Sequence, residues 1–130
     1  MDMIGSNVYN YVNVLDKAAD ASWMRNDIIT NNLANVDTPN YKRKDVQFET
    51  YLIAQVAGGD SLDENINGID LSNLTPTTYV DQASLSYRMD GNNVDIDTET
   101  AEFAKNQIRY YTLLDSMTQE FSRIKSVLAR

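Results

Sequence analysis

A chain of 130 residues has room for one sizeable hydrophobic core, and this one carries a formal net charge of −8 with no cysteine and no histidine. These counts exclude disulfides, thiolate nucleophiles, imidazole bases and the commonest zinc and copper ligands. The acidic balance argues against a nucleic-acid partner, because phosphate binding needs a clustered basic surface.

Membrane and phosphate signals are also weak. The N-terminus has no apolar run of signal-peptide length, and no stretch approaches the ~18 apolar residues of a membrane span. We therefore expect no direct membrane span and no cleaved signal peptide. We interpret the one basic run, Lys42, Arg43 and Lys44, as a solvated turn rather than a phosphate site.

The N-terminal part predicts a long helix over residues 8–36. Apolar or small residues recur there in alternating steps of four and three, which is typical of a coiled-coil seam. They are Val8, Val12, Leu15, Ala19, Ser22, Asn26, Ile29, Leu33 and Val36. Asn26 either pairs with a polar group and fixes the register of the seam, or faces solvent. Trp23 lies off the seam, and we expect it to contact the middle segment or a second molecule.

Pro39 sets the limit of this helix. It has no backbone N–H to donate, and it disfavours the α conformation at Thr38, so the helix must end at or before Thr38. Asn40 follows the proline at a point where a turn can require positive φ, a conformation that asparagine tolerates well.

Residues 37–97 predict a small, irregular middle lobe. Apolar residues between Asp45 and Val56 indicate a short helix, which Gly58 and Gly59 end. Residues 60–78 are polar and lack periodicity, so we expect an irregular or mobile loop. The segment 79–89 indicates a strand, 90–93 a tight turn, and 94–96 the returning strand of a hairpin.

A second long helix is expected over residues 98–130. Asp97 is the predicted N-cap, and Glu99 in the first turn complements the helix dipole. Two apolar heptad stripes run along it out of phase by three residues. The first is Ala101, Ala104, Ile108 and Tyr111, and the second is Tyr110, Leu114, Met117, Phe121, Ile124 and Leu128.

Both helices are too long for a spherical domain of this size. We predict a mainly α, single-domain fold in which the two helices form an elongated antiparallel coiled-coil pair, with a small irregular and β-hairpin lobe at one end. Such a pair is marginal alone, so further burial must come from neighbouring molecules. The predicted assembly seam consists of Leu15, Ile29, Leu33, Ile108, Leu114, Met117, Phe121, Ile124 and Leu128.

The sequence indicates no catalytic residue, cofactor or metal site. It has no Gly-rich phosphate loop, nucleophile elbow or metal-binding His pair. Residues 63–68 match the first half of a calcium-loop pattern, but the twelfth position is Leu74, where a bidentate glutamate is required. A small calcium-binding module therefore remains only a minor alternative.

The string N-N-L-A-N-V-D-T-P-N-Y at residues 31–41 resembles the N-terminal signature of the bacterial flagellar rod, hook and related axial proteins. The family usually has glycine at the position of Asn40, and asparagine retains tolerance of the left-handed conformation. The residues that carry this resemblance are Asn32, Ala34, Asn35, Thr38, Pro39, Asn40 and Tyr41.

A second string, D-G-N-N-V-D-I-D at residues 90–97, resembles the signature that precedes the C-terminal helix in proximal-rod members of the family. Together the two resemblances cover both ends of the chain and leave about residues 45 to 85 unmatched. The residues of this second motif are Asp90, Gly91, Asn92, Val94, Asp95 and Asp97.

The resemblance implies a non-enzymatic, structural subunit of the flagellar basal-body rod, closest to the proximal rod. Such subunits lie in the cell envelope and are exported unfolded by the flagellar type III apparatus. They stack with other rod proteins and the export-gate adaptor into a helical tube that transmits torque. Two alternatives are a different rod subunit, of the FlgC type, and a coiled-coil adaptor unrelated to flagella.

Overall fold

The computed structural model describes residues 3–57, 61–82 and 88–129, with side chains from Tyr9 onward. Two long helices, α1 (Met3–Ala34) and α4 (Ile96–Leu128), make up most of the molecule. Between them lie β1 (Lys44–Gln47), α2 (Glu49–Val56), α3 (Leu62–Asn67), the 3-10 helix η1 (Leu71–Leu74) and β2 (Thr77–Val80). Within the described part of the chain, no helix is long and apolar enough to span a membrane.

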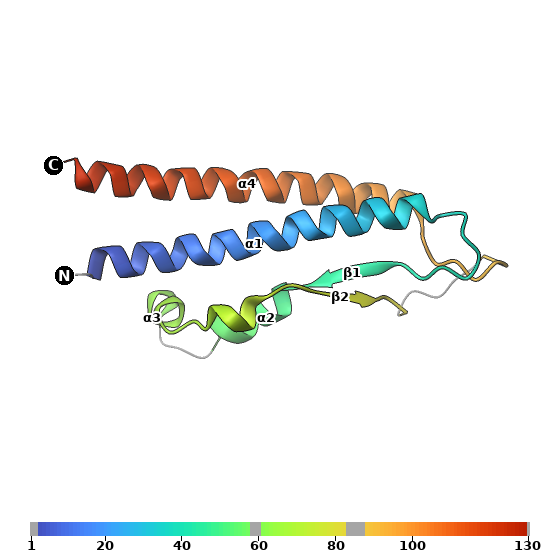
Figure 1. Cartoon of the computed structure of the whole chain (residues 1–130), viewed down its shortest axis with the longest axis horizontal. Coiled ribbons are helices and arrows are strands. Elements are labelled where there is room, and N and C mark those ends of the chain that lie inside the picture. Colours follow the sequence, from blue (N-terminus) through green and yellow to red (C-terminus); the bar gives the residue numbers. More distant parts are fainter. Residues whose placement is uncertain (1–2, 58–60, 83–87, 130) are drawn as a thin grey trace.

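Helices α1 and α4 lie side by side and antiparallel, so that both ends of the chain are at the same end of the molecule (Figure 1). This confirms the predicted mainly α fold built on a pair of terminal helices. Helix α1 begins before Val8 and ends at Ala34, which satisfies the limit imposed by Pro39. The N-cap of α4 is Asp95 rather than Asp97, because the Asp95 carboxylate accepts a hydrogen bond from the Asp97 backbone N–H at 3.1 Å.

The middle segment does not form a lobe at one end, as predicted, but folds back along α1 (Figure 1). The region expected to be one helix, 45–56, divides into β1 and α2. The region expected to be an irregular loop contains α3 and η1.

The small antiparallel sheet pairs different strands from those expected. Strand β2 pairs with β1, in a register that places Tyr79 opposite Asp45, and not with residues 94–96. The prediction that residues 94–96 form the returning strand of a hairpin is therefore wrong. Asn92 to Asp95 lead directly into α4, and Ile96 is already the first residue of that helix. Residues 83–87 of the predicted strand lie outside the described residues.

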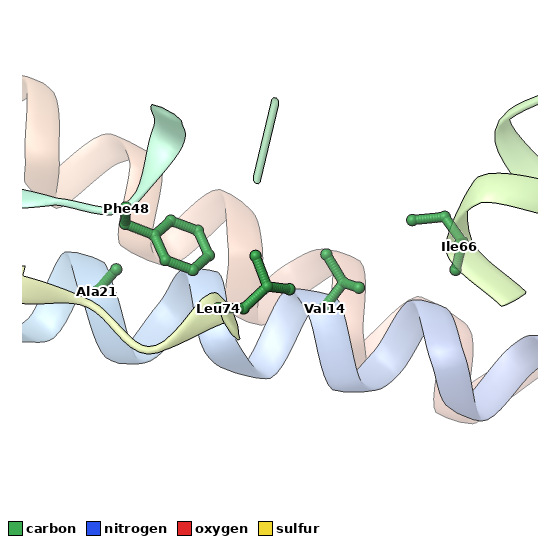
Figure 2. Packing of buried hydrophobic residues seen from close by; sticks show 5 residues of the cluster. All are labelled: Val14, Ala21, Phe48, Ile66 and Leu74. Carbon is green, nitrogen blue, oxygen red and sulfur yellow. The ribbon is translucent and has the colours of Figure 1, made fainter. Parts of the chain in front are cut away.

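The hydrophobic core lies between α1 and the folded-back middle segment. Figure 2 shows Phe48 and Leu74 beside Val14 and Ala21 of α1, with Ile66 of α3 farther along. Partly buried side chains from α2, η1 and α1 surround this cluster. The segment that resembles a calcium loop forms α3, and Leu74 is fully buried in this core.

The seam between α1 and α4 is more polar than the apolar pattern predicted. Ser22, Glu99 and Asn106 are buried in it, and Asn106 donates a hydrogen bond to the Ser22 carbonyl at 2.7 Å. The side-chain oxygens of Asn26 and Asn106 are buried without a hydrogen-bond partner among the described residues. The side-chain oxygen of Asn26 is therefore neither exposed to solvent nor paired, although the residue as a whole is half-buried, and the seam contains a polar layer at its centre.

Helix α4 turns toward α1 only half of the second predicted stripe, namely Tyr110, Met117 and Ile124. The buried and half-buried residues include a run in steps of four and three: Glu99, Phe103, Asn106, Tyr110, Leu113, Met117, Glu120 and Ile124. Four predicted seam residues are exposed instead: Leu114 (37%), Phe121 (50%), Ile108 (70%) and Leu128 (78%). Their assignment to the seam within one chain was wrong, because hydrogen bonds of Glu99 and Asn106 fix the rotation of α4.

Candidate functional site at the junction of the two motifs

The two sequence motifs meet in space where α1 ends and α4 begins. After Ala34 the chain makes a turn in which the Thr38 backbone N–H bonds to the Asn35 carbonyl at 3.0 Å. Asn40 has a φ of 63°, which confirms the expected left-handed conformation. Its backbone N–H donates to the Asp90 carbonyl at 2.7 Å, so the first motif binds directly to the second.

The side chain of Asn92 binds the backbone carbonyls that follow the C-terminal end of α1. Its side chain is fully buried, and its amide group lies 2.8 Å from the Asn35 carbonyl, 3.0 Å from that of Val36 and 2.9 Å from that of Thr38. Carbonyls at the C-terminal end of a helix have no partner within the helix and need an outside donor. An asparagine more than fifty residues away in the sequence supplies such a donor here, in addition to the Thr38 and Tyr41 N–H groups and Arg88. Its Oδ1 also accepts a bond from the Val94 N–H, which fixes the approach to α4.

Gly91 permits the close approach of the two motifs. Its φ of 79° lies in the left-handed region, where a side chain is strained. A Cβ atom there would lie 2.5 Å from Oδ1 of Asn40. The Gly91 carbonyl also accepts a hydrogen bond from Nζ of Lys42. Glycine is therefore favoured at this position first by its positive φ, and any side chain there would also displace the amide of Asn40.

Asn32 ties α1 to both β1 and α4. Its Oδ1 accepts bonds from the Tyr41 hydroxyl at 3.0 Å and the Lys44 N–H at 2.9 Å. Its Nδ2 donates to the Lys44 carbonyl at 2.8 Å and to Oε2 of Glu99 at 3.2 Å. The side-chain amide of Asn32 thus makes the two hydrogen bonds to the backbone of Lys44 that a neighbouring strand would make. All hydrogen-bonding groups of this buried amide have partners.

Arg43 neutralises the buried carboxylate of Glu99. Its Nε donates to Oε1 of Glu99, and its Nη1 lies 2.6 Å from Oδ2 of Asp81. Burial acts to lower the pKa of Arg43, but its hydrogen bonds to Glu99 and Asp81 outweigh this and raise the pKa above the usual range. The pKa of Tyr41 is raised, first by burial and then by the charge of Glu99. Arg43 is therefore a structural ion-pair residue, and its assignment to a solvated turn was wrong.

A second set of ion pairs links the middle segment to both long helices. Arg25 of α1 makes two parallel bonds to Glu49, at 2.6 and 2.8 Å, and its Nη2 also donates to the Val46 carbonyl at 2.9 Å. Arg109 of α4 approaches the same Glu49 at 3.2 Å. These residues line a polar groove of about 470 Å³ between β1, α2 and α4, in which the arginines and carboxylates are paired with one another.

The Glu49 contacts predict an acid-sensitive contribution to stability. Hydrogen bonds from Arg25 hold the pKa of Glu49 below its ordinary value of 4.5. A lowered folded-state pKa means that this contribution is complete above the unfolded pKa and is lost as the pH falls through the folded pKa. We expect Glu49→Gln to lower stability modestly at pH 7, because the side chain is 48% exposed, and to flatten the loss of stability below about pH 4.5. Urea unfolding of the unaltered chain and of the variant between pH 3 and 7 measures how the free energy of unfolding depends on pH. A pH profile of Glu49→Gln as steep as that of the unaltered chain would contradict the assignment.

The structure brings together most of the predicted motif residues. Asn32, Asn35, Thr38, Asn40, Tyr41, Asp90, Gly91, Asn92 and Val94 lie within this junction, and Asp95 caps α4. Ala34 and Pro39 are exposed, and Asp97 supplies its backbone N–H to the cap. Arg43 and the buried role of Glu99 were missed, because a buried ion pair between residues 56 apart leaves no periodic signal.

Comparisons with known proteins agree with this geometry. A family model described as flagella basal body rod protein matches residues 18–42, which end in the first motif. The flagellar basal body rod protein FlgB of Bacillus subtilis (strain 168) is 36% identical, over 98% of this chain and 97% of the relative. The FlgB proteins of Borrelia hermsii and Escherichia coli (strain K12) are 33% and 30% identical, over 90% and 80% of this chain and 94% and 82% of their own lengths.

Proposed function

This chain belongs to the FlgB family of flagellar basal body rod proteins, and we propose that its copies pack side by side with other rod proteins into a helical tube. The family is structural and non-enzymatic, and the chain is a component of the basal body. In the proximal rod, the long helices would form the shaft and transmit torque through their packing.

The observation that carries this proposal is the exposed apolar stripe of α4. Leu114, Phe121 and Leu128 repeat every seven residues and lie beside the seam, not in it. A heptad repeat of large apolar residues on a helix is the pattern that binds a further helix. Exposed apolar patches of this kind mark interaction surfaces. We therefore assign this stripe, defined as the outer stripe of α4, to contacts between subunits.

The junction of the two motifs has a different role in this proposal. It fixes the direction in which the chain leaves α1 and the rotation with which α4 starts. The shape of each subunit is then set before it enters the tube, and the outer stripe is presented at a constant angle to α1. The proposed partners are other rod proteins and the export-gate adaptor, and the proposed route is the flagellar type III apparatus.

The proposal is tested in cells whose only copy of this protein is the chain with an epitope tag on the exposed side of α3, away from the buried Ile66. We expect the tagged chain in isolated basal bodies, and we expect deletion to abolish swimming while the plasmid-borne chain restores it. If the chain stayed in the soluble fraction while basal bodies with complete rods formed, the proposed function would be wrong. A discrete soluble oligomer without basal-body association would favour the coiled-coil adaptor instead.

A further inference from the structure

Helix α1 has three faces, and only two of them are covered. One face packs on α4, through residues such as Ala19, Ser22 and Ile29. A second packs on the middle segment through Val14 and Ala21. The third is exposed, and we define it as the outer stripe of α1. It consists of Asp16, Asp20, Trp23 and Asp27, in steps of four and three.

Trp23 is the largest side chain on this stripe and is 59% exposed. From the sequence we expected Trp23 to contact the middle segment or a second molecule. Within the chain, its ring packs against Tyr110 of α4, with the ring centroids 5.9 Å apart. Tyr110 in turn packs against Tyr111. Tryptophan and tyrosine are the side chains most often found at the energetic centre of protein interfaces. One edge of Trp23 is therefore fixed by Tyr110, and most of its ring is left open for a partner.

The charges around Trp23 define what that partner must carry. None of the ion pairs between described residues involves Asp16, Asp20 or Asp27. Like charges one turn apart on a helix repel each other, so Asp16 and Asp20 are a cost in the isolated subunit. A cation flanked by apolar side chains would remove this cost and cover Trp23 by a cation–π contact.

The chain itself has a surface of that composition at the far end of α4. Phe121, Lys125 and Leu128 follow one another in steps of four and three, so they share one side of the helix, and all three are exposed. No acidic residue occurs between Phe121 and Ala129. By contrast, the exposed cations Lys105, Arg109 and Arg123 are each paired with a glutamate of the same chain.

The two surfaces cannot meet within one subunit. Trp23 lies beside Tyr110, and Lys125 follows Tyr110 by 15 residues, or about 22 Å of helix. A contact between them therefore needs a second copy displaced along the helix axis. Because the two surfaces differ, one head-to-tail contact leaves one copy with a free outer stripe of α1 and the other with a free α4 surface, and such a contact propagates instead of closing into a dimer.

We propose that the outer stripe of α1, centred on Trp23, binds the Phe121–Lys125–Leu128 surface of α4 of a second copy. This inference rests on the proposed function, and it names the pair of surfaces that join neighbouring subunits. Lys125 lies between Asp20 and Asp27 of the neighbour, and Phe121 and Leu128 cover the open part of the Trp23 ring.

The absence of cysteine in the chain allows a direct test. The double variant Asp20→Cys with Lys125→Cys is produced as the only copy of the protein, and isolated basal bodies are treated with a short thiol-specific cross-linker. We expect linked dimers and higher multimers of the chain, with loss of most of the monomer band on a denaturing gel. Asp20→Cys with Lys105→Cys is the matched control, because Lys105 is also exposed on α4 but lies outside the proposed surface. It should remain monomeric.

Charge exchange provides the second measurement. Lys125→Glu should strongly reduce swimming, and combining it with Asp20→Lys should restore a large part of it. Basal bodies that contain the chain but yield only monomer with the first cysteine pair would overturn the contact and leave the proposed function intact. A link to a different rod protein would overturn the choice of a second copy. If the wild-type chain were absent from basal bodies, the proposed function itself would fail, and the contact with it.

Discussion

Replacing Phe121 or Leu114 with aspartate should abolish swimming while leaving the isolated chain folded. Both side chains are exposed on the outer stripe of α4, so neither contributes to the core formed by α1 and the middle segment. A carboxylate there meets solvent in the free subunit but is buried against the next helix in the proposed assembly. Burying an unpaired charge costs several kcal/mol, which is enough to prevent incorporation.

The measurement has two parts, because swimming alone does not separate folding from assembly. Circular dichroism should show an unchanged helix content. Urea unfolding of the purified chain should show a loss of no more than about 1–2 kcal/mol, larger for Leu114, which is 37% exposed, than for Phe121, which is 50% exposed. Soft-agar swimming and the amount of chain in isolated basal bodies should both fall to background. Ser122→Asp is the matched control, since it adds the same charge at an exposed position next to Phe121 but on another side of α4. Normal swimming by either stripe variant would remove the main support for the assigned surface.

The sequence was sufficient to predict the two long helices and the turn that follows the first of them. A steady alternation of four and three residues is a local signal, and so is the inability of Pro39 to continue a helix. The positive φ of Asn40 also followed from its place after the proline. These features depend on neighbours within a few residues, which is why they could be identified without the fold.

The rotation of α4 and the pairing of the strands could not be predicted in the same way. Apolar pattern alone favoured Leu114 and Phe121 as the buried stripe, whereas the structure buries Glu99 and Asn106. Glu99 is tolerated there only because Arg43 and Asn32 reach it from distant parts of the chain. Strands β1 and β2 likewise pair across about thirty residues. Contacts of such long sequence separation leave little trace in a local pattern.

This failure of the local pattern has a functional meaning. If the apolar stripe of α4 were used within the subunit, the helix pair would be self-sufficient and would present little to a neighbour. Polar residues hold the internal seam instead, through specific hydrogen bonds. Under our proposal, the apolar stripe is thereby left for contacts between molecules.

Asn92→Ala should have the largest effect on the stability of the subunit itself. The substitution leaves the carbonyls of Asn35, Val36 and Thr38 without the amide donor that now lies within 3.0 Å of each. It also removes the acceptor of the Val94 N–H. The three carbonyls keep second donors, in the Thr38 N–H, the Tyr41 N–H and Arg88, so each loses a shared hydrogen bond and is not left unsatisfied. The buried Val94 N–H loses its acceptor, which costs about 1–3 kcal/mol, and each weakened carbonyl bond adds up to about 1 kcal/mol. We expect a loss of roughly 2–4 kcal/mol in the free energy of unfolding.

Pro39→Ala is the informative comparison, because the proline and Asn92 are two different ways of ending α1. The helix already ends at Ala34, five residues before Pro39, and Pro39 itself is exposed. We therefore expect Pro39→Ala to cost much less stability than Asn92→Ala, and to impair assembly more than soluble expression by loosening the exit turn. Urea unfolding ranks the two variants, and hydrogen exchange at residues 35–41 reports whether the turn has opened. If Pro39→Ala proved the more destabilising variant, the exit of α1 would be set by the proline itself and not by the second motif closing over it.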